Sequence, residues 1–283
     1  CGGNHNIFVG IGTSYNMAKI LAGMYSGIAL TPDDVVLCHD YSGAHLYVLS
    51  QSGETYDTLS LLRSSKIDTF EKVTILTNRE NSTMESLFPN DVVQIGCGEE
   101  KGVLATKSAI AQLLAADAVM GYNESSLTIE DIERAKEGAT LLVKDLTFRQ
   151  GIWSPPTPIG FFGNGYLKGV AMEAALKWQE SVYATVIGTS LSELKHGPLA
   201  CVDKNFTAVV FDGPKWLKTD IGIEEIEARG GCVCLVAYND KRSMMYNIMY
   251  QLVVVYWLAL LAAEELGHDP DMPRNLAKSI TVP

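Results

Sequence analysis

The sequence lacks several features that would assign it to a class of protein at once. Basic residues are few: 22 Lys and Arg stand against 33 Asp and Glu, and the formal net charge is −11. This balance argues against nucleic acid or an anionic membrane surface as a partner, because both attract basic patches. A small anionic ligand stays possible, since backbone amides and a few lysines can bind it locally.

Long hydrophobic runs are also absent. The longest, residues 252–263, has about a dozen residues, whereas a helix that spans a bilayer needs about 20. We therefore expect a core or interface helix here, and no membrane. No signal peptide is visible, and the sequence begins without a methionine.

The six cysteines and five histidines show no spacing typical of a metal site. Most of the cysteines lie in or beside apolar segments, so we expect reduced, buried thiols, as in a cytoplasmic protein. Cys232 and Cys234 are separated by one residue on a predicted strand, and we predict neither a disulfide nor a paired metal site there. We predict no metal and no cofactor.

What the sequence does contain is a regular alternation of strands and helices over 283 residues, with 47% hydrophobic side chains to build a core. The alternation predicts an α/β fold of parallel sheets covered by helices on both faces. We predict strands at residues 7–11, 35–38, 45–49, 73–77, 92–95, 159–162, 206–211 and 231–237. We predict helices at residues 17–24, 56–66, 110–118, 128–146, 170–180 and 247–266.

Each half of the chain opens on a strand, a glycine-containing turn and a helix, which suggests a duplicated α/β unit. The proline-rich segment 151–158 is the predicted boundary between the halves. The second turn, at residues 163–165, lacks the third glycine and the following acidic residue of a dinucleotide site, so we reject a nicotinamide cofactor. We expect a first domain at 1–127, a linking helix and connector at 128–154, a second domain at 155–267 and a tail at 268–283.

The segment Ser50-Gln51-Ser52-Gly53-Glu54-Thr55 joins a predicted strand to a predicted helix. Its hydroxyls and backbone amides suit a phosphate group, and Gly53 permits a close approach of the backbone. A helix cap without a ligand is the alternative explanation. Two similar turns, at residues 10–14 and 102–106, are expected at the same carboxyl edge of the sheet, where ligands of such folds bind.

Three charged residues, Glu173, Lys177 and Glu180, share one face of the helix predicted at 170–180. A solvated ladder of salt bridges is one explanation. The position of this helix, directly after the first strand and glycine turn of the second half, favours a site instead. His196 precedes Gly-Pro in a predicted irregular loop, and its imidazole suits proton transfer near neutral pH.

The tail, residues 269–283, begins with two prolines that prevent continuation of the preceding helix. Its apolar residues alternate with Arg274 and Lys278. The tail is therefore either a frayed terminus or a segment that docks on a site. A desolvated Lys278 could attack a carbonyl group and form a Schiff base.

Six motifs together resemble the double sugar-isomerase (SIS) domain family, and the resemblance spans nearly the whole chain. The tail motif indicates the amino-sugar branch of the family. The motifs are Gly12-Thr13-Ser14-Tyr15, the segment 50–55, Ala105-Thr106-Lys107 and residues 173–180, 193–200 and 273–279. The resemblance implies two tandem SIS domains, each a parallel sheet flanked by helices in a flavodoxin-like three-layer sandwich.

The resemblance also implies roles for individual residues. The phosphate of a sugar phosphate would bind to Thr13, Ser14, Ser50, Gln51, Ser52 and Thr55, with further substrate contacts from Ala105 and Thr106. Glu180 would move a proton between sugar C1 and C2, assisted by Lys177 and Glu173. His196 would open the sugar ring, acting from the partner subunit of a homodimer. Lys278 would form the Schiff base with the open-chain ketose.

Two departures from the family concern the details of this site. Ala174 replaces a glycine that is common in the family, and the connection at residues 38–41 is shorter than the family's loop, which puts its contacts in question.

Three functions remain open at this stage. The first is an aldose–ketose isomerase acting on fructose 6-phosphate and glucosamine 6-phosphate, without a glutaminase domain and with a separate source of ammonia. The second is an amino-sugar-phosphate deaminase or a fructosamine-6-phosphate deglycase. The third is a non-catalytic sugar-phosphate sensor, which would have no reason to keep Glu180, His196 and Lys278 together, so an enzyme is favoured.

Overall fold

The computed structural model describes residues 5–37, 41–122, 127–150, 158–217 and 219–278. The chain divides into two compact units, one of residues 1–123 with 274–283 and the other of residues 124–273. The predicted boundary at 151–158 and the shortened connection at 38–41 lie mostly outside the described residues.

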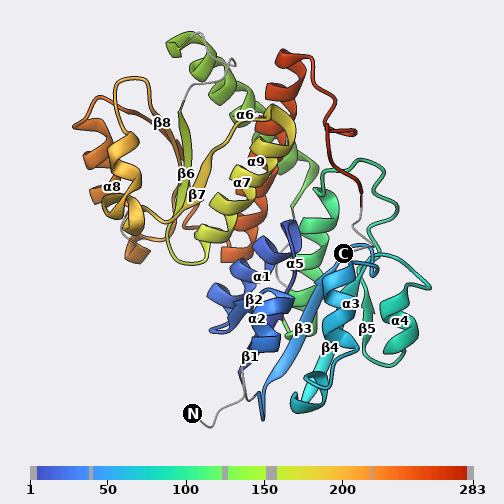
Figure 1. The fold of residues 1–283 in the computed structure, drawn as a ribbon. Coiled ribbons are helices and arrows are strands. Elements are labelled where there is room, and N and C mark those ends of the chain that lie inside the picture. The colour runs from blue at the N-terminus through green and yellow to red at the C-terminus, as the bar shows by residue number, and fades with distance from the viewer. Residues whose placement is uncertain (1–4, 38–40, 123–126, 151–157, 218, 279–283) are drawn as a thin grey trace. The chain divides into compact units, whose positions relative to one another are not determined.

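The described part of the first unit contains a five-stranded parallel sheet (Figure 1). Its strands run in the order β2-β1-β3-β4-β5, which is the order of flavodoxin-like folds. The strands are β1 (Asn6–Val9), β2 (Ile28–Leu30), β3 (His45–Ser50), β4 (Lys72–Thr77) and β5 (Val92–Gln94). The helices are α1 (Thr13–Met24), α2 (Pro32–Leu37), α3 (Tyr56–Leu62), α4 (Thr83–Leu87) and α5 (Lys107–Val119).

Helices cover both faces of this sheet. Alternate strand residues such as Leu46 and Ile75 form one buried cluster with Val35 of α2, Leu59 of α3 and Met84 of α4. Residues of opposite parity face the other way, where α1 packs against α5. This alternation explains why the strands are apolar on both sides, as the prediction of a doubly covered parallel sheet requires.

The predicted strand at residues 35–38 is wrong. Residues 32–37 form α2, because Thr31 and Asp34 cap its start reciprocally: the Asp34 carboxylate accepts from the Thr31 amide at 3.1 Å, and the Asp34 amide donates to the Thr31 hydroxyl at 3.3 Å. Pro32 suits the first helical turn. The strand beside β1 is instead the preceding segment, β2, which pairs through Ile28 with Ile7.

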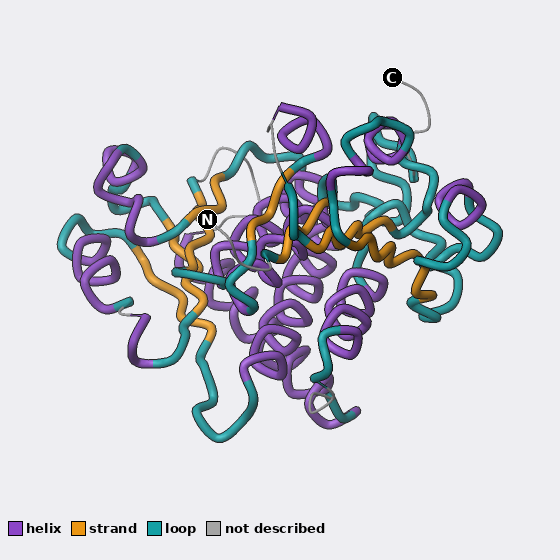
Figure 2. Tube along the Cα trace, turned by 90° about the horizontal axis from the view of Figure 1, so that it is seen from below, coloured by secondary structure: helices purple, strands orange, loops and turns teal. Residues whose placement is uncertain are grey.

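The described part of the second unit contains a four-stranded parallel sheet in the order β7-β6-β8-β9. As in the first unit, the first strand lies between the second and the third, with helices flanking the strands (Figure 2). The strands are β6 (Ile159–Gly163), β7 (Ile187–Thr189), β8 (Thr207–Phe211) and β9 (Cys232–Val236). The helices are α6 (Ile129–Gln150), α7 (Leu167–Val182), α8 (Asp220–Glu227) and α9 (Met244–Leu266). The prediction of an α/β fold with parallel sheets flanked by helices is confirmed.

Helix α9 is the central helix of the second unit. It packs against both α6 and α7, and it begins at Ser243, whose hydroxyl accepts from the Tyr246 amide. By length and composition it could span a membrane, but 67% of its most apolar window is buried inside the structure, as in the core helix of a globular protein. This matches the predicted core or interface helix.

The prediction of buried cysteines is only partly correct. Cys97, Cys201, Cys232 and Cys234 are free thiols, and Cys234 is buried. Cys201 is exposed because it ends a short 3₁₀ helix, Pro198–Cys201, rather than lying in a strand. Within the described residues, no group of His, Cys, Asp and Glu side chains could hold a metal ion.

Candidate active site

The loop after β3 contains most of the predicted phosphate-binding residues. Two of its hydroxyls shape the loop: Ser50 Oγ accepts from the Gly53 amide at 3.1 Å, and Ser52 Oγ accepts from the Glu54 amide at 3.2 Å. Gly53 has φ 65°, and a Cβ added to it would lie 2.5 Å from Ser82 Cβ. Only glycine fits this position, so the loop depends on it.

Glu54 has a structural role in this loop rather than a place toward a ligand. Its two carboxylate oxygens accept from the Thr83 amide at 2.9 Å and from the Thr83 hydroxyl at 2.7 Å, which ties the loop to α4. Gln51, Ser52 and Thr55 are half-buried and keep polar groups near the surface.

Helix α3 ends at Leu62 instead of the predicted residue 66. Just after this end, the Ser64 hydroxyl donates a hydrogen bond to the Leu61 carbonyl at 2.7 Å.

The turn between β1 and α1 also requires glycine. A Cβ at Gly10 would lie 2.5 Å from the backbone of Ser14, so the strand can pass close to the helix start only without a side chain. Thr13 and Ser14, both half-buried, begin α1. Ser14 Oγ accepts from Gln112 Nε2 of α5 at 3.0 Å, and the buried Gln112 is a partner that the sequence did not indicate.

A cavity of about 710 Å³ lies at the carboxyl edge of the first sheet. It brings together Gln51 and Ser52 of the loop after β3, the segments after β4 and β5, and Lys278 of the tail. Its lining residues are Gln51, Ser52, Asn78, Arg79, Glu80, Gln94, Gly96, Gly98, Glu99, Glu100 and Lys278. The remaining predicted residues of this unit, Thr13, Ser14, Ser50, Thr55, Ala105 and Thr106, are not among its described lining residues.

Asn78, which sequence reasoning missed, organises one wall of this cavity. It follows β4 directly, and its side chain donates to the Gly98 carbonyl at 2.8 Å and accepts from the Cys97 amide at 3.0 Å. A polar residue at the carboxyl end of a central strand was the available signal, because ligands of parallel sheets bind at that edge.

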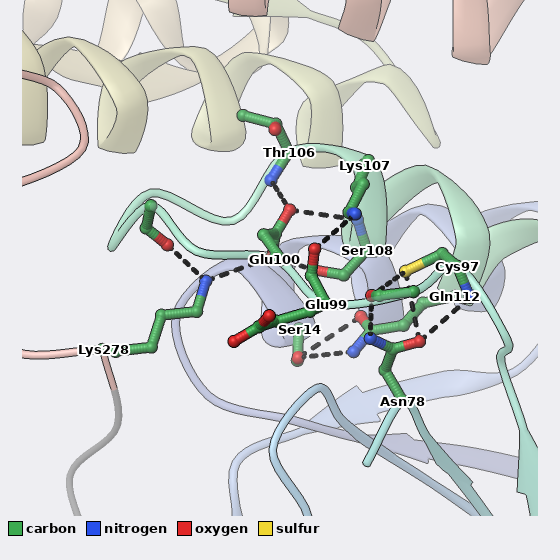
Figure 3. A network of polar contacts seen from close by, with 12 residues as sticks. Ser14, Asn78, Cys97, Glu99, Glu100, Thr106, Lys107, Ser108, Gln112 and Lys278 are labelled. Carbon is green, nitrogen blue, oxygen red and sulfur yellow. Dashed lines mark hydrogen bonds and ion pairs between the residues drawn. The ribbon is translucent and has the colours of Figure 1, made fainter.

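Lys278 is held at the cavity by two oxygen atoms (Figure 3). Its Nζ donates to the Gly102 carbonyl at 2.5 Å and to Glu100 Oε2 at 3.2 Å. We expected a desolvated lysine, but the Lys278 side chain is 30% exposed and is therefore only partly desolvated. It forms an ion pair with Glu100.

Glu100, the partner of Lys278, is a buried carboxylate that the sequence did not indicate. It accepts from the Thr106 amide at 2.9 Å, from the Ser108 amide at 3.2 Å and from the Ser108 hydroxyl at 2.5 Å. Burial alone would raise the pKa of Glu100, but these hydrogen bonds, together with Lys278, outweigh it and hold the pKa below its ordinary value. The group is therefore a carboxylate at neutral pH.

The three charged residues on α7 form a buried network. Glu173 and Lys177 are 0% and 1% exposed, and Lys177 Nζ lies 2.6 Å from Glu180 Oε2 and 3.6 Å from Glu173 Oε1. Burial would lower the pKa of Lys177, but the two carboxylates outweigh it and raise the pKa, so the lysine stays charged. The alternative of a solvated salt-bridge ladder is wrong, since only Glu180, at 19% exposure, reaches solvent.

His196 lies at the end of a 3₁₀ helix, Leu191–His196, rather than in an irregular loop, and it is exposed. The same short helix is tied to the start of α7 through Glu193, which pairs with Lys168 at 3.0 Å. In the part of the chain that the structure describes, no hydrogen bond or ion pair joins His196 to Lys177 or Glu180. Its action from a partner subunit stays a prediction.

The predicted site residues divide between the two units. The phosphate-binding candidates, Ala105, Thr106 and Lys278 belong to the first unit, and Glu173, Lys177, Glu180 and His196 belong to the second. Within the first unit, the structure brings Gln51, Ser52 and Lys278 to one cavity. Within the second, it brings the three α7 residues into contact.

Comparison with known proteins finds relatives that match nearly the whole chain. No family model matches the chain. A glutamine–fructose-6-phosphate aminotransferase (isomerizing) from Methanothermobacter thermautotrophicus is 31% identical over 306 residues, which cover 97% of this chain and 51% of that protein. The corresponding protein of Thermus thermophilus is 33% identical over 83% of this chain and 43% of its own length. The chain thus spans about half the length of the curated relatives it matches.

Solved structures agree with these relatives. The C-terminal domain of glucosamine-fructose-6-phosphate aminotransferase from Francisella tularensis has a TM-score of 0.78 and 26% identity, over 95% of this chain and 86% of its own. A glucosamine-6-phosphate deaminase from Thermotoga maritima has a TM-score of 0.80 over 98% of this chain and 91% of its own. At 19% identity, the second likeness concerns the fold alone.

Proposed function

Because the chain belongs to the double sugar-isomerase family and is related over 97% of its length to glutamine–fructose-6-phosphate aminotransferases, we propose that it is an aldose–ketose isomerase of phosphosugars. Its substrates are fructose 6-phosphate and glucosamine 6-phosphate, in amino-sugar metabolism. In this proposal the two units are tandem SIS domains, and ammonia is the nitrogen donor of the synthesis.

The observation that supports the proposal most is the cavity of the first unit. It combines an uncharged polar loop, at Gln51 and Ser52, with a primary amine, that of Lys278. A phosphosugar needs both, since one end is an anion and the other is an electrophilic carbonyl. At about 710 Å³ the cavity is within the range of roughly 300–1,000 Å³ that is typical of small-molecule sites.

The phosphate is assigned to the hydroxyl and amide groups of Thr13, Ser14, Ser50, Gln51, Ser52 and Thr55. Neutral donors of this kind bind a dianion without burying a further charge. Ala105 and Thr106, which precede α5, are assigned further contacts with the sugar. The Thr106 amide already donates to Glu100, so the contact of Thr106 would come from another of its atoms.

The chemistry begins with the open-chain ketose. The Lys278 amine condenses with the C2 carbonyl to give an iminium and water, and ammonia then displaces the lysine to give the C2 imine of the free sugar. A carboxylate next removes a proton from C1 and returns it to C2, while the C1 hydroxyl proton moves to the nitrogen, so that the C2=N double bond is replaced by a C1=O double bond and a free amine remains on C2. We assign this carboxylate to Glu180, the member of the α7 network that reaches solvent. Lys177 and Glu173 hold it in place, and His196 opens the ring from the partner subunit of a homodimer.

Product analysis tests the reaction. The protein is incubated with fructose 6-phosphate plus ammonium and, separately, with glucosamine 6-phosphate alone. Net formation of glucosamine 6-phosphate in the first reaction is the expected result. Rapid release of ammonia in the second would instead identify a deaminase. A rise of melting temperature with sugar phosphate but no product in either reaction would indicate a sensor.

The residue assignments are tested by substitution. Glu180→Gln should abolish isotope exchange at C2 while the phosphosugar still raises the melting temperature. Glu227→Gln, at an exposed carboxylate of α8, is the control and should exchange like the wild type. Exchange that survives in Glu180→Gln contradicts the assignment of the base. A monomeric mass in light scattering contradicts the action of His196 across subunits.

A further inference from the structure

We propose that Glu100 is a positioning residue for the Schiff-base step: it holds the Lys278 amine at the cavity and serves as the counter-ion of the iminium that this amine forms. The inference rests on the proposed function and deepens it, since no sequence motif assigned a role to Glu100.

The contacts of Glu100 support this role. Its two oxygens receive four described hydrogen bonds, three from the segment that starts α5 and one from Lys278. The Glu100 side chain is only 5% exposed, whereas Lys278 is 30% exposed. A carboxylate that is fixed by hydrogen bonds from one side and pairs with a cation on the other side anchors that cation.

The second partner of Lys278, the Gly102 carbonyl, restricts the directions from which the amine can be reached. The Gly102 carbonyl accepts from Nζ at 2.5 Å, and Gly102 lies in the segment that connects Glu100 to α5. An ammonium group has three N–H donors, so two are used by Glu100 and Gly102 and one direction remains. When the third N–H gives its proton to the solvent, the lone pair points in this remaining direction, so the amine has one approach for a carbonyl.

The charge balance of the reaction explains why a permanent carboxylate is useful. An ammonium and a carbonyl give an iminium and water, so one positive charge is present on the nitrogen before and after the step. The new C=N bond replaces the C=O bond, and the two lost N–H hydrogens leave with the oxygen as water. The same carboxylate can thus pair with both states, without a change of its own protonation.

A purely structural role is the competing explanation, since Glu100 also ties the segment 102–108 together. The two roles are separable. Ser108→Ala removes the hydroxyl bond to Glu100 and leaves the contact with Lys278, whereas Glu100→Gln removes the charge and keeps a side chain of the same shape. Glu100→Asp keeps the charge and shortens its reach.

The experiment is reductive trapping on the full chain. Each variant is incubated with fructose 6-phosphate and cyanoborohydride, and the rate of labelling at Lys278 is measured by mass spectrometry of the peptide. Binding is measured in parallel with sorbitol 6-phosphate, which has no carbonyl, by its effect on the melting temperature.

Loss of the charge should slow labelling about tenfold or more in Glu100→Gln, given that a hydrogen bond to a charged group contributes about 1.5–3 kcal/mol. Sorbitol 6-phosphate should still bind within about twofold, since the hydrogen bonds of Glu100 among the described residues go to Thr106, Ser108 and Lys278 and not to residues 50–55. Glu100→Asp should recover part of the rate, and Ser108→Ala should label like the wild type.

If Glu100→Gln is labelled at Lys278 at the same rate as the wild type, the inference is overturned and the proposed function stays intact. An equal loss in Ser108→Ala, or a matching loss of sorbitol 6-phosphate binding in Glu100→Gln, assigns Glu100 a structural role and also overturns it. If the wild type binds sorbitol 6-phosphate but does not label, the Schiff-base step itself fails, and the inference fails with it.

Discussion

Replacement of Lys177 by methionine tests the buried network of α7. Methionine keeps most of the length and the apolar stem of lysine but removes the ammonium. Glu173, which is 0% exposed, then loses the cation 3.6 Å from its carboxylate. Removal of one partner of a buried ion pair typically costs about 3–5 kcal/mol, because the other charge stays buried without compensation.

The second unit runs over residues 124–273, a length at which each kcal/mol lowers the melting temperature by about 2–4 °C. We therefore expect Lys177→Met to melt roughly 6–20 °C below the wild type. The pKa of Lys177 is raised above the ordinary value for lysine, so this difference should be constant below pH about 10.5 and should shrink as the pH rises further.

Tryptophan fluorescence in urea measures this unit selectively. All four tryptophans of the sequence lie in the second unit. One of them, Trp178, is next to Lys177 on α7 and packs edge-to-face on Phe161 with ring centroids 5.8 Å apart. The unfolding transition of the second unit can therefore be followed while the first unit adds no tryptophan signal.

Two further variants complete the measurement. Lys168→Met on the same helix is the control, since its ion pair with Glu193 is exposed and should contribute only about 0–1 kcal/mol. The double variant Lys177→Met with Glu173→Gln should recover part of the loss, because the buried negative charge of Glu173 is then removed together with the cation. A cost below about 1 kcal/mol for Lys177→Met would refute the reasoning.

Three other predictions concern the stability of single positions. Gly53→Ala should lower the free energy of unfolding of the first unit by more than Gly43→Ala does, as measured by circular dichroism in urea. Both glycines have positive φ (65° and 76°), which costs an alanine about 1–2 kcal/mol, but only at Gly53 does the new Cβ also meet Ser82. Equal costs would contradict the crowding seen at this loop. Burial, helped by a nearby lysine, lowers the pKa of His45 to about 4, so the stability of the first unit should fall between pH 6.5 and 4, and His45→Phe should flatten this dependence in thermal melts. An unchanged profile would show that His45 is not held neutral. Hydrogen bonds hold the pKa of Asp131 at about 2, so the second unit should lose stability as the pH falls from about 4 to 2, and Asp131→Asn should lack this phase in tryptophan fluorescence. Persistence of the phase would assign it to other carboxylates.

The alternation of apolar strands and amphipathic helices predicted the fold class, because the periods of strand and helix are local properties of the sequence. It failed where a short apolar stretch had a helix cap in front of it. Residues 35–37 are apolar and β-branched in part, yet the capping pair of Thr31 and Asp34 starts a helix there. Strand β7, with three residues, was too short to show a period.

The motifs that identified the family are also local: glycine turns, hydroxyl runs and charged residues at helical spacing can be seen without a structure. They indicated Gln51, Ser52, Glu180 and Lys278 as candidates. They could not indicate burial. The ladder of Glu173, Lys177 and Glu180 has the same spacing on a solvated helix and on a buried one, and only the packing of α7 in its unit decided which it is.

What the sequence by itself determined is therefore the class of fold, the family and the chemical types of the groups at the candidate site. The tertiary structure decided which of these groups meet. Lys278 and Glu100 are 178 residues apart, and nothing in the spacing of either motif relates them. Their pairing depends on the path of the tail back to the first sheet, and such contacts between distant segments are a property of the folded chain rather than of any local pattern.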